Sequence, residues 1–141
     1  MSLKKLLMIF LVLFFAFANF SHARWQKLSG GGEGDYTQYF DTDSVKLTEN
    51  GKWRIWDLMD YKYPKVATNG EMLRSSKSYW EIDCKEYQIK LLTGSWFTGQ
   101  MSSGQSMGSV RSGEYQYISP GSIGESLAIP LCNPERINKP N

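Results

Sequence analysis

Apolar and polar residues alternate along much of the chain, which is the pattern of β-strands with one buried face. The clearest stretch is residues 78–84, where Trp80, Ile82 and Cys84 share one face. Further strands are expected at residues 36–41, 46–49, 52–61, 71–87, 88–97 and 114–118, with a short one at 24–28. The pattern therefore predicts an antiparallel sheet of about five to six strands.

Turn residues separate these strands. Asn50-Gly51 lies between two extended runs and predicts a hairpin with a type I′ turn, because both residues tolerate a positive φ. Pro64 cannot donate a ladder hydrogen bond, so we expect residues 62–70 to form a loop.

Residues 41–44, Asp-Thr-Asp-Ser, resemble the start of a calcium loop. The later ligand positions of such a loop are missing, since Val45 and Lys46 occupy two of them. We therefore expect a turn held by hydrogen bonds from Asp41 or Ser44 to nearby backbone.

A short helix is expected to begin at Ser122. Ser122 and Glu125 have the spacing of a capping box, and Pro130 should limit the helix to about two turns. Its apolar stripe consists of Ile123, Leu127 and Leu131. We expect this stripe to cover the apolar face of residues 78–84.

Residues 1–23 have the features of a signal peptide. Lys4 and Lys5 precede an apolar run, and Ser21-His22-Ala23 fits a signal-peptidase site. The alternative is an uncleaved N-terminal anchor. We expect cleavage near Ala23, a single domain at residues 24–141, and a periplasmic or secreted product.

The two cysteines, Cys84 and Cys132, are expected to form a disulfide, because a pair of cysteines in a small exported chain usually does. Neither lies at the cleavage site, so we expect no lipid attachment and no stable membrane anchor. The expected fold class is α+β: a small antiparallel sheet packed by a short C-terminal helix that the disulfide ties on.

Charge and composition exclude several functions. The chain has 16 Lys and Arg against 14 Asp and Glu, but Lys4 and Lys5 belong to the leader, which contains no acid. The remaining chain is formally neutral, which argues against nucleic-acid binding. The single histidine, His22, also lies in the leader, so we expect no histidine-activated nucleophile, no metal site and no cofactor.

Glu81 and Asp83 share one strand face and are the only paired carboxylates that suggest acid-base chemistry. We expect this acidic face to be ordinary solvated surface. No catalytic residue is assigned.

Two regions are candidates for partner binding. On residues 52–61, Trp53 shares a face with Ile55 and Met59, and Trp56 lies with Leu58 on the other, so both faces are partly apolar. Residues 94–113 mix glycine and serine with large apolar side chains, which suits a recognition loop. The alternative is a strand that continues into the core, followed by a mobile hairpin loop. The candidate surface residues are Trp53, Trp56, Trp96, Phe97, Met101 and Met107.

The order and spacing of several short motifs resemble the bacterial surface-adhesin protein E family. The motifs are Tyr39-Phe40-Asp41, Asp43-Ser44-Val45, residues 53–61, Glu81-Ile82-Asp83-Cys84, residues 118–122, and Glu125-Ser126-Leu127 with Cys132. The resemblance covers nearly all of residues 24–141. It implies a small sheet packed by a C-terminal helix, a disulfide between them, and a non-enzymatic role in binding host extracellular-matrix and serum proteins. The named member of the family is a lipoprotein, whereas the leader of this chain is not followed by a cysteine that could carry a lipid.

The function expected from the sequence is that of an exported, non-enzymatic envelope protein that recognises a protein partner, such as an envelope or host extracellular-matrix protein. One alternative is a small envelope hydrolase acting through carboxylates. Another is a structural subunit of an envelope assembly.

Overall fold

The computed structural model describes residues 24–28, 34–67 and 69–133. The expected signal peptide lies outside these residues. The described chain forms one antiparallel sheet with the strand order β1-β2-β4-β5-β6-β7, to which two short strands, β3 and β8, are added. The strands are β1 (Trp25–Lys27), β2 (Tyr36–Asp41), β3 (Lys46–Leu47), β4 (Trp53–Val66), β5 (Met72–Asp83), β6 (Gln88–Phe97), β7 (Ser106–Arg111) and β8 (Gln116–Tyr117).

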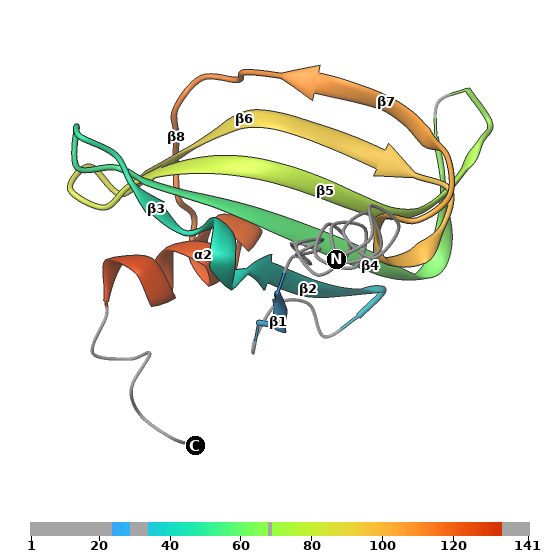
Figure 1. Ribbon diagram of the computed structural model, residues 1–141, viewed down its shortest axis with the longest axis horizontal. Coiled ribbons are helices and arrows are strands. Elements are labelled where there is room, and N and C mark those ends of the chain that lie inside the picture. Colours follow the sequence, from blue (N-terminus) through green and yellow to red (C-terminus); the bar gives the residue numbers. More distant parts are fainter. Residues whose placement is uncertain (1–23, 29–33, 68, 134–141) are drawn as a thin grey trace, which may run out of the picture.

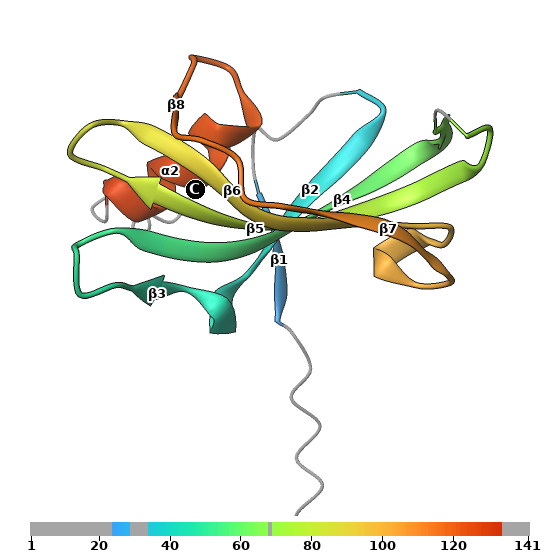
Figure 2. The same cartoon turned by 90° about the horizontal axis from the view of Figure 1, so that it is seen from above.

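Among the described residues, one α-helix, α2 (Ile123–Cys132), packs under one end of the sheet (Figure 1). The turn between β4 and β5 lies at the opposite end. Figure 2 shows the strong twist of the sheet, with β3 beside the beginning of β4. The predicted fold class, an antiparallel sheet with one C-terminal helix, is confirmed.

The core lies between α2 and the face of the sheet that carries Ile55 and Ile82. The buried cluster consists of Leu28, Ile55, Ile82, Ile118, Leu127, Ala128 and Leu131. Trp80 and Cys84 pack against it, as their alternation with Ile82 predicts. Two residues of the predicted helical stripe, Leu127 and Leu131, are buried in this core, and Ile123 packs against it.

The beginning of α2 follows the prediction closely. The Ser122 hydroxyl accepts a hydrogen bond from the Glu125 amide (3.2 Å), and the Glu125 carboxylate accepts one from the Gly121 amide (2.7 Å). The helix is longer than predicted, because Pro130 lies in its last turn and does not end it. Because proline has no N–H, the helix lacks the hydrogen bond that the Ser126 carbonyl would accept from residue 130.

The predicted disulfide is confirmed. Cys84 follows β5 and Cys132 is the last residue of α2, and the two Cα atoms lie 5.4 Å apart. The bond ties the helix to the central part of the sheet, because β5 lies between β4 and β6.

The β3–β4 hairpin is confirmed, but its predicted type I′ turn is wrong. Among the residues of this turn, only Gly51 has a positive φ (72°). The Gly51 amide donates to the Thr48 carbonyl (2.9 Å), and the Thr48 amide donates to the Lys52 carbonyl (2.8 Å). These bonds describe a three-residue loop closed by a glycine in the left-handed region, in which Asn50 needs no positive φ.

The loop predicted from Pro64 is wrong in its first half, because β4 continues to Val66. The pairing shifts from Asp60↔Ser75 to Lys65↔Leu73, which leaves three more residues on β4 than on β5. Pro64 lies within this irregularity, where no regular ladder bond is required of it.

The predicted turn at residues 41–44 is confirmed as a single 3-10 turn at Thr42–Ser44. The Asp41 carboxylate accepts a hydrogen bond from the Asp43 amide (3.0 Å), and the Ser44 hydroxyl donates to the Asp41 carbonyl (2.7 Å).

Residues 94–113 do not form one long loop. They contain the end of β6 and all of β7, joined by a connection with a short 3-10 turn at Gln100–Ser102. The predicted last strand, residues 114–118, is reduced to β8, which pairs with the beginning of β6.

Candidate partner-binding surface

The end of the sheet away from α2 carries a cleft of about 350 Å³, which we call the tip cleft. Its lining residues are Ala67, Asn69, Leu73, Trp96 and Met107. Two of the candidate residues predicted from sequence, Trp96 and Met107, are therefore brought together. They lie on β6 and β7, while the other lining residues belong to β5 and the turn that precedes it.

Two large apolar side chains are exposed beside this cleft, and we call them the tip surface. Val66 and Met72 face each other across β4 and β5 and are 68% and 50% exposed. Single exposed apolar residues are common, whereas a cross-strand pair beside an apolar cleft makes this end of the sheet a candidate contact surface. This surface was not predicted from the sequence, because Pro64 led us to place Val66 in a loop, although Met72 lies in the strand expected at residues 71–87.

Met101, another candidate, lies in the connection between β6 and β7 and is exposed. Its amide donates to the Asp60 carboxylate (2.7 Å), and the next amide, of Ser102, donates to the Ser75 hydroxyl (2.9 Å). Met101 and Ser102 both have positive φ values, of 52° and 58°. Such a conformation costs roughly 1–2 kcal/mol for a residue with a side chain, so these two bonds help to hold the connection against the sheet.

Trp56 and Phe97 lie on the face of the sheet that α2 does not cover. Trp56 stacks on Tyr79 with ring centroids 4.9 Å apart. The Lys77 ammonium lies 5.1 Å from the centroid of Trp56 and 6.0 Å from that of Phe97. Trp53, by contrast, packs against the core beside α2. The six candidate residues therefore do not form one continuous surface.

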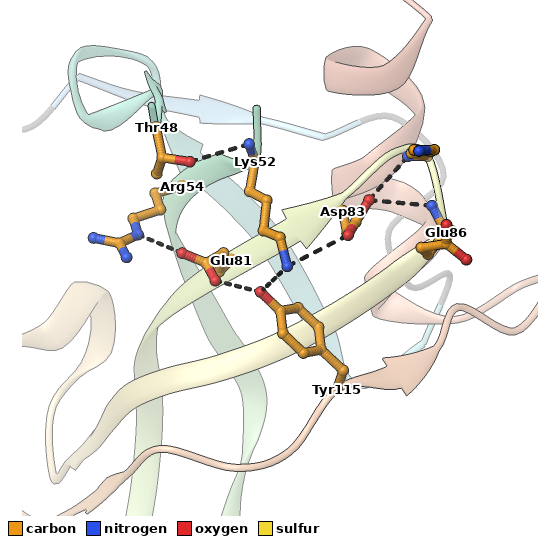
Figure 3. A network of polar contacts seen from close by, with 8 residues as sticks. Thr48, Lys52, Arg54, Glu81, Asp83, Glu86 and Tyr115 are labelled. Carbon is orange, nitrogen blue, oxygen red and sulfur yellow. Dashed lines mark hydrogen bonds and ion pairs between the residues drawn. The ribbon is translucent and has the colours of Figure 1, made fainter. Parts of the chain in front are cut away.

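A network of charged residues occupies the same uncovered face, at the α2 end (Figure 3). The Arg54 Nε lies 2.7 Å from a Glu81 oxygen, and the Tyr115 hydroxyl donates to the other Glu81 oxygen. Lys52 donates to the Tyr115 hydroxyl (2.9 Å) and pairs with Asp83 (3.4 Å). The expectation of a solvated acidic face is wrong for Glu81, which is only 8% exposed.

The network sets the protonation of both carboxylates. Burial acts to raise the pKa of Glu81, but hydrogen bonds from Tyr115 and Arg54 outweigh it, so its pKa lies below the ordinary value. The Glu86 amide and Lys52 lower the pKa of Asp83. A general acid needs a raised pKa, so neither carboxyl group is suited to donate a proton at neutral pH.

Asp57 is a second polar feature, and it was not predicted from the sequence. It is 1% exposed and accepts hydrogen bonds from Gln38 Nε2 and Trp80 Nε1, each at 3.0 Å. Ser126 of α2 donates to the Gln38 side-chain oxygen (2.7 Å), which connects Asp57 to the helix. Burial raises the pKa of Asp57 to about 6. The sequence pattern that could have identified Asp57 is its position: it is an acid on the same strand face as the apolar residues Trp53 and Ile55.

Within the described part of the chain, no cluster of three or more His, Cys, Asp or Glu side chains is arranged to hold a metal ion. None of the helices in the same residues is long and apolar enough to cross a membrane.

Comparison with solved structures supports the fold. Crystal form II of Haemophilus influenzae protein E superposes with a TM-score of 0.57 at 11% identity, covering 78% of this chain and 96% of that one. Protein E from non-typeable Haemophilus influenzae gives a TM-score of 0.53 at 12% identity, covering 83% and 89%. No curated protein sequence matches the chain significantly. The family model for surface-adhesin protein E matches residues 25–133, and the chain therefore belongs to the surface-adhesin protein E family.

Proposed function

We propose that this protein is an exported, non-enzymatic binding protein of the bacterial envelope and that it recognises a protein partner. The observation that carries the proposal is the family match, which spans residues 25–133 and so includes every strand and the helix of the described fold. The proposed partner is an envelope protein or a host extracellular-matrix protein.

We place the contact at the tip surface and the tip cleft. Exposed Val66 and Met72 provide apolar contact area, and Trp96 and Met107 provide a recess beside it. Large apolar side chains in such a recess commonly supply most of the binding energy of an interface. Met101, Trp56 and Phe97 stay candidates for a wider contact, whereas Trp53 is left out because it packs against the core.

The geometry of the carboxylates argues against the alternative of a hydrolase. Both oxygens of Glu81 are engaged, one by Arg54 and one by Tyr115. Asp57 has a raised pKa, but it is buried under α2 and makes its hydrogen bonds to Gln38 and Trp80. Neither group is positioned to reach a substrate.

Export is proposed on two observations. Residues 1–23 have the composition of a signal peptide, and the Cys84–Cys132 disulfide suits an oxidising compartment. We propose cleavage after Ala23.

The test uses residues 24–141 as bait against purified matrix proteins and envelope extracts. We expect a saturable protein partner, and we expect the double variant Val66→Ser/Met72→Ser to weaken binding by about tenfold, which corresponds to roughly 1.4 kcal/mol. Leu47→Ser is the matched control, because Leu47 is 54% exposed and belongs to β3, which lies at the other end of the sheet.

Three results would count against the proposal. Wild-type protein that captures no partner would remove the binding role. Turnover of envelope glycans that is lost in Glu81→Gln would favour a hydrolase. A fixed stoichiometric complex in cross-linked extracts would favour a structural subunit.

A further inference from the structure

Strand β7 is an open edge of the sheet. It pairs with β6 on one side and is the last strand in the order among the described strands, as Figure 1 shows. Alternate residues of an antiparallel strand direct their backbone N–H and C=O groups to one neighbour, so half of those on β7 point away from β6. Such a row of free backbone groups is a template for another strand.

The register identifies the outward groups. The Val110 carbonyl accepts from the Thr93 hydroxyl (3.0 Å) and the Ser112 amide donates to the Leu92 carbonyl (2.8 Å), so Val110 and Ser112 face β6. By alternation, the backbone groups of Ser109 and Arg111 face outward.

Strand β7 has few of the features that protect sheet edges. The other edge strand, β1, is three residues long and ends in Lys27. Strand β7 has six residues and contains neither proline nor lysine. A register shift opposite Trp96 marks one irregular point, and the part beyond it, Ser109–Arg111, is regularly paired.

The same edge borders the tip cleft, because Met107 of β7 and Trp96 of β6 line it. A strand added along β7 can therefore place one large apolar side chain into the cleft. Residues 106–112 carry one charge, that of Arg111.

We propose that β7 is a docking edge to which an extended segment of the partner protein adds as a further strand. The segment places a large apolar side chain in the tip cleft and a carboxylate near Arg111. A second copy of this chain fits less well, because half of its β7 residues are serine or glycine and its one charge would bring another arginine to the same edge. The inference rests on the proposed function and names the class of its partner.

The first experiment selects random peptides displayed on phage against residues 24–141. We expect selected peptides to combine a large apolar residue with Asp or Glu. On adding one synthetic peptide, hydrogen exchange should slow at the Ser109 and Arg111 amides and stay unchanged at Val110. N-methylation of alternate peptide amides should weaken binding by about tenfold, because it removes the ladder donors.

The second experiment uses variants of the edge and measures the affinity for the same peptide. Ser109→Pro removes an outward donor and Met107→Ser empties part of the cleft, and each should raise the Kd by about tenfold. Arg111→Gln should raise it by roughly threefold and weaken its salt dependence. Leu47→Ser is the control and should leave the Kd unchanged.

Equal affinity for N-methylated and unmodified peptides would overturn the inference, and this arm does not depend on how Ser109→Pro folds. A concentration-dependent dimer that Ser109→Pro abolishes would overturn it too, because the occupant would then be a second copy. If the full partner binds wild type and Ser109→Pro equally well, the docking edge is wrong and the proposed function stands. If no partner binds the wild type, the proposed function itself fails.

Discussion

At the scale of single residues, Asp57 is a buried acid whose negative charge opposes folding. Its pKa is raised from 3.8 to about 6 because the carboxylate is buried, and no cation among the described residues pairs with it. The folded state therefore prefers the protonated form. The stability that this preference contributes is fully present below pH 4 and is lost as the pH rises through 6.

We predict that Asp57→Asn removes this dependence. Asparagine can still accept from Trp80, and Gln38 can reverse its amide, because the Ser126 hydroxyl is able to accept as well as donate. We expect the variant to be about 2 kcal/mol more stable than the wild type at pH 8 and close to it at pH 4.

Urea unfolding at both pH values measures this difference. Asp43→Asn, a change at an exposed acid, is the control and should follow the wild type. The account of Asp57 would be wrong if the two proteins lost stability in parallel between pH 4 and 8.

At the scale of elements, the disulfide decides how firmly α2 is held. The helix is ten residues long, too short to be stable in isolation, so its stability comes from packing and from the bond to Cys84.

We predict that Cys84→Ser/Cys132→Ser lowers the free energy of unfolding by about 4 kcal/mol, the chain-entropy value for a closed loop of this length. The two cysteines are 48 residues apart in sequence. Guanidinium unfolding of the oxidised wild type and the double variant measures the loss. Dithiothreitol should destabilise the wild type by a similar amount and leave the double variant unchanged. An equal response of both proteins to the reductant would contradict the prediction.

The sequence predicts most elements because their local signals agree with the fold. The strand at residues 88–97, the helix beginning after Ser122 and the Cys84–Cys132 pair were all expected. The loop predicted from Pro64 was partly wrong, because a proline usually ends a strand. The irregular pairing that accommodates Pro64 depends on β5, which lies further along the chain and cannot be read from the residues around Pro64.

At the scale of the whole molecule, residues 24–141 are proposed to form one domain. Every described strand belongs to one sheet, and the buried cluster joins Leu28 near the beginning to Leu131 near the end. One core of this kind unfolds as a unit.

We predict that residues 24–141, expressed without the leader and oxidised, unfold in a single transition. Tryptophan fluorescence and far-ultraviolet circular dichroism should report the same midpoint. Mass spectrometry of the exported full-length protein should find Arg24 as its first residue. Separate transitions, or a first residue far from Arg24, would contradict the proposed domain boundary.

The binding surface was less predictable than the fold. Trp96 and Met107 stood out as apolar residues in a polar context, and the structure places both at the tip cleft. Val66 and Met72 are exposed because β4 and β5 extend beyond the neighbouring strands. The local sequence does not determine how far they extend.

The position of the disulfide also determines how the protein would respond to mechanical load. Strands β6, β7 and β8 and the helix all lie within the covalent ring that Cys84 and Cys132 close. A pull on the chain beyond Cys132 would pass through the sulfur bridge directly to β5, in the middle of the sheet. Under tension the chain between Cys84 and Cys132 cannot be pulled out to its full length, so β7 and its proposed partner would stay close to β5.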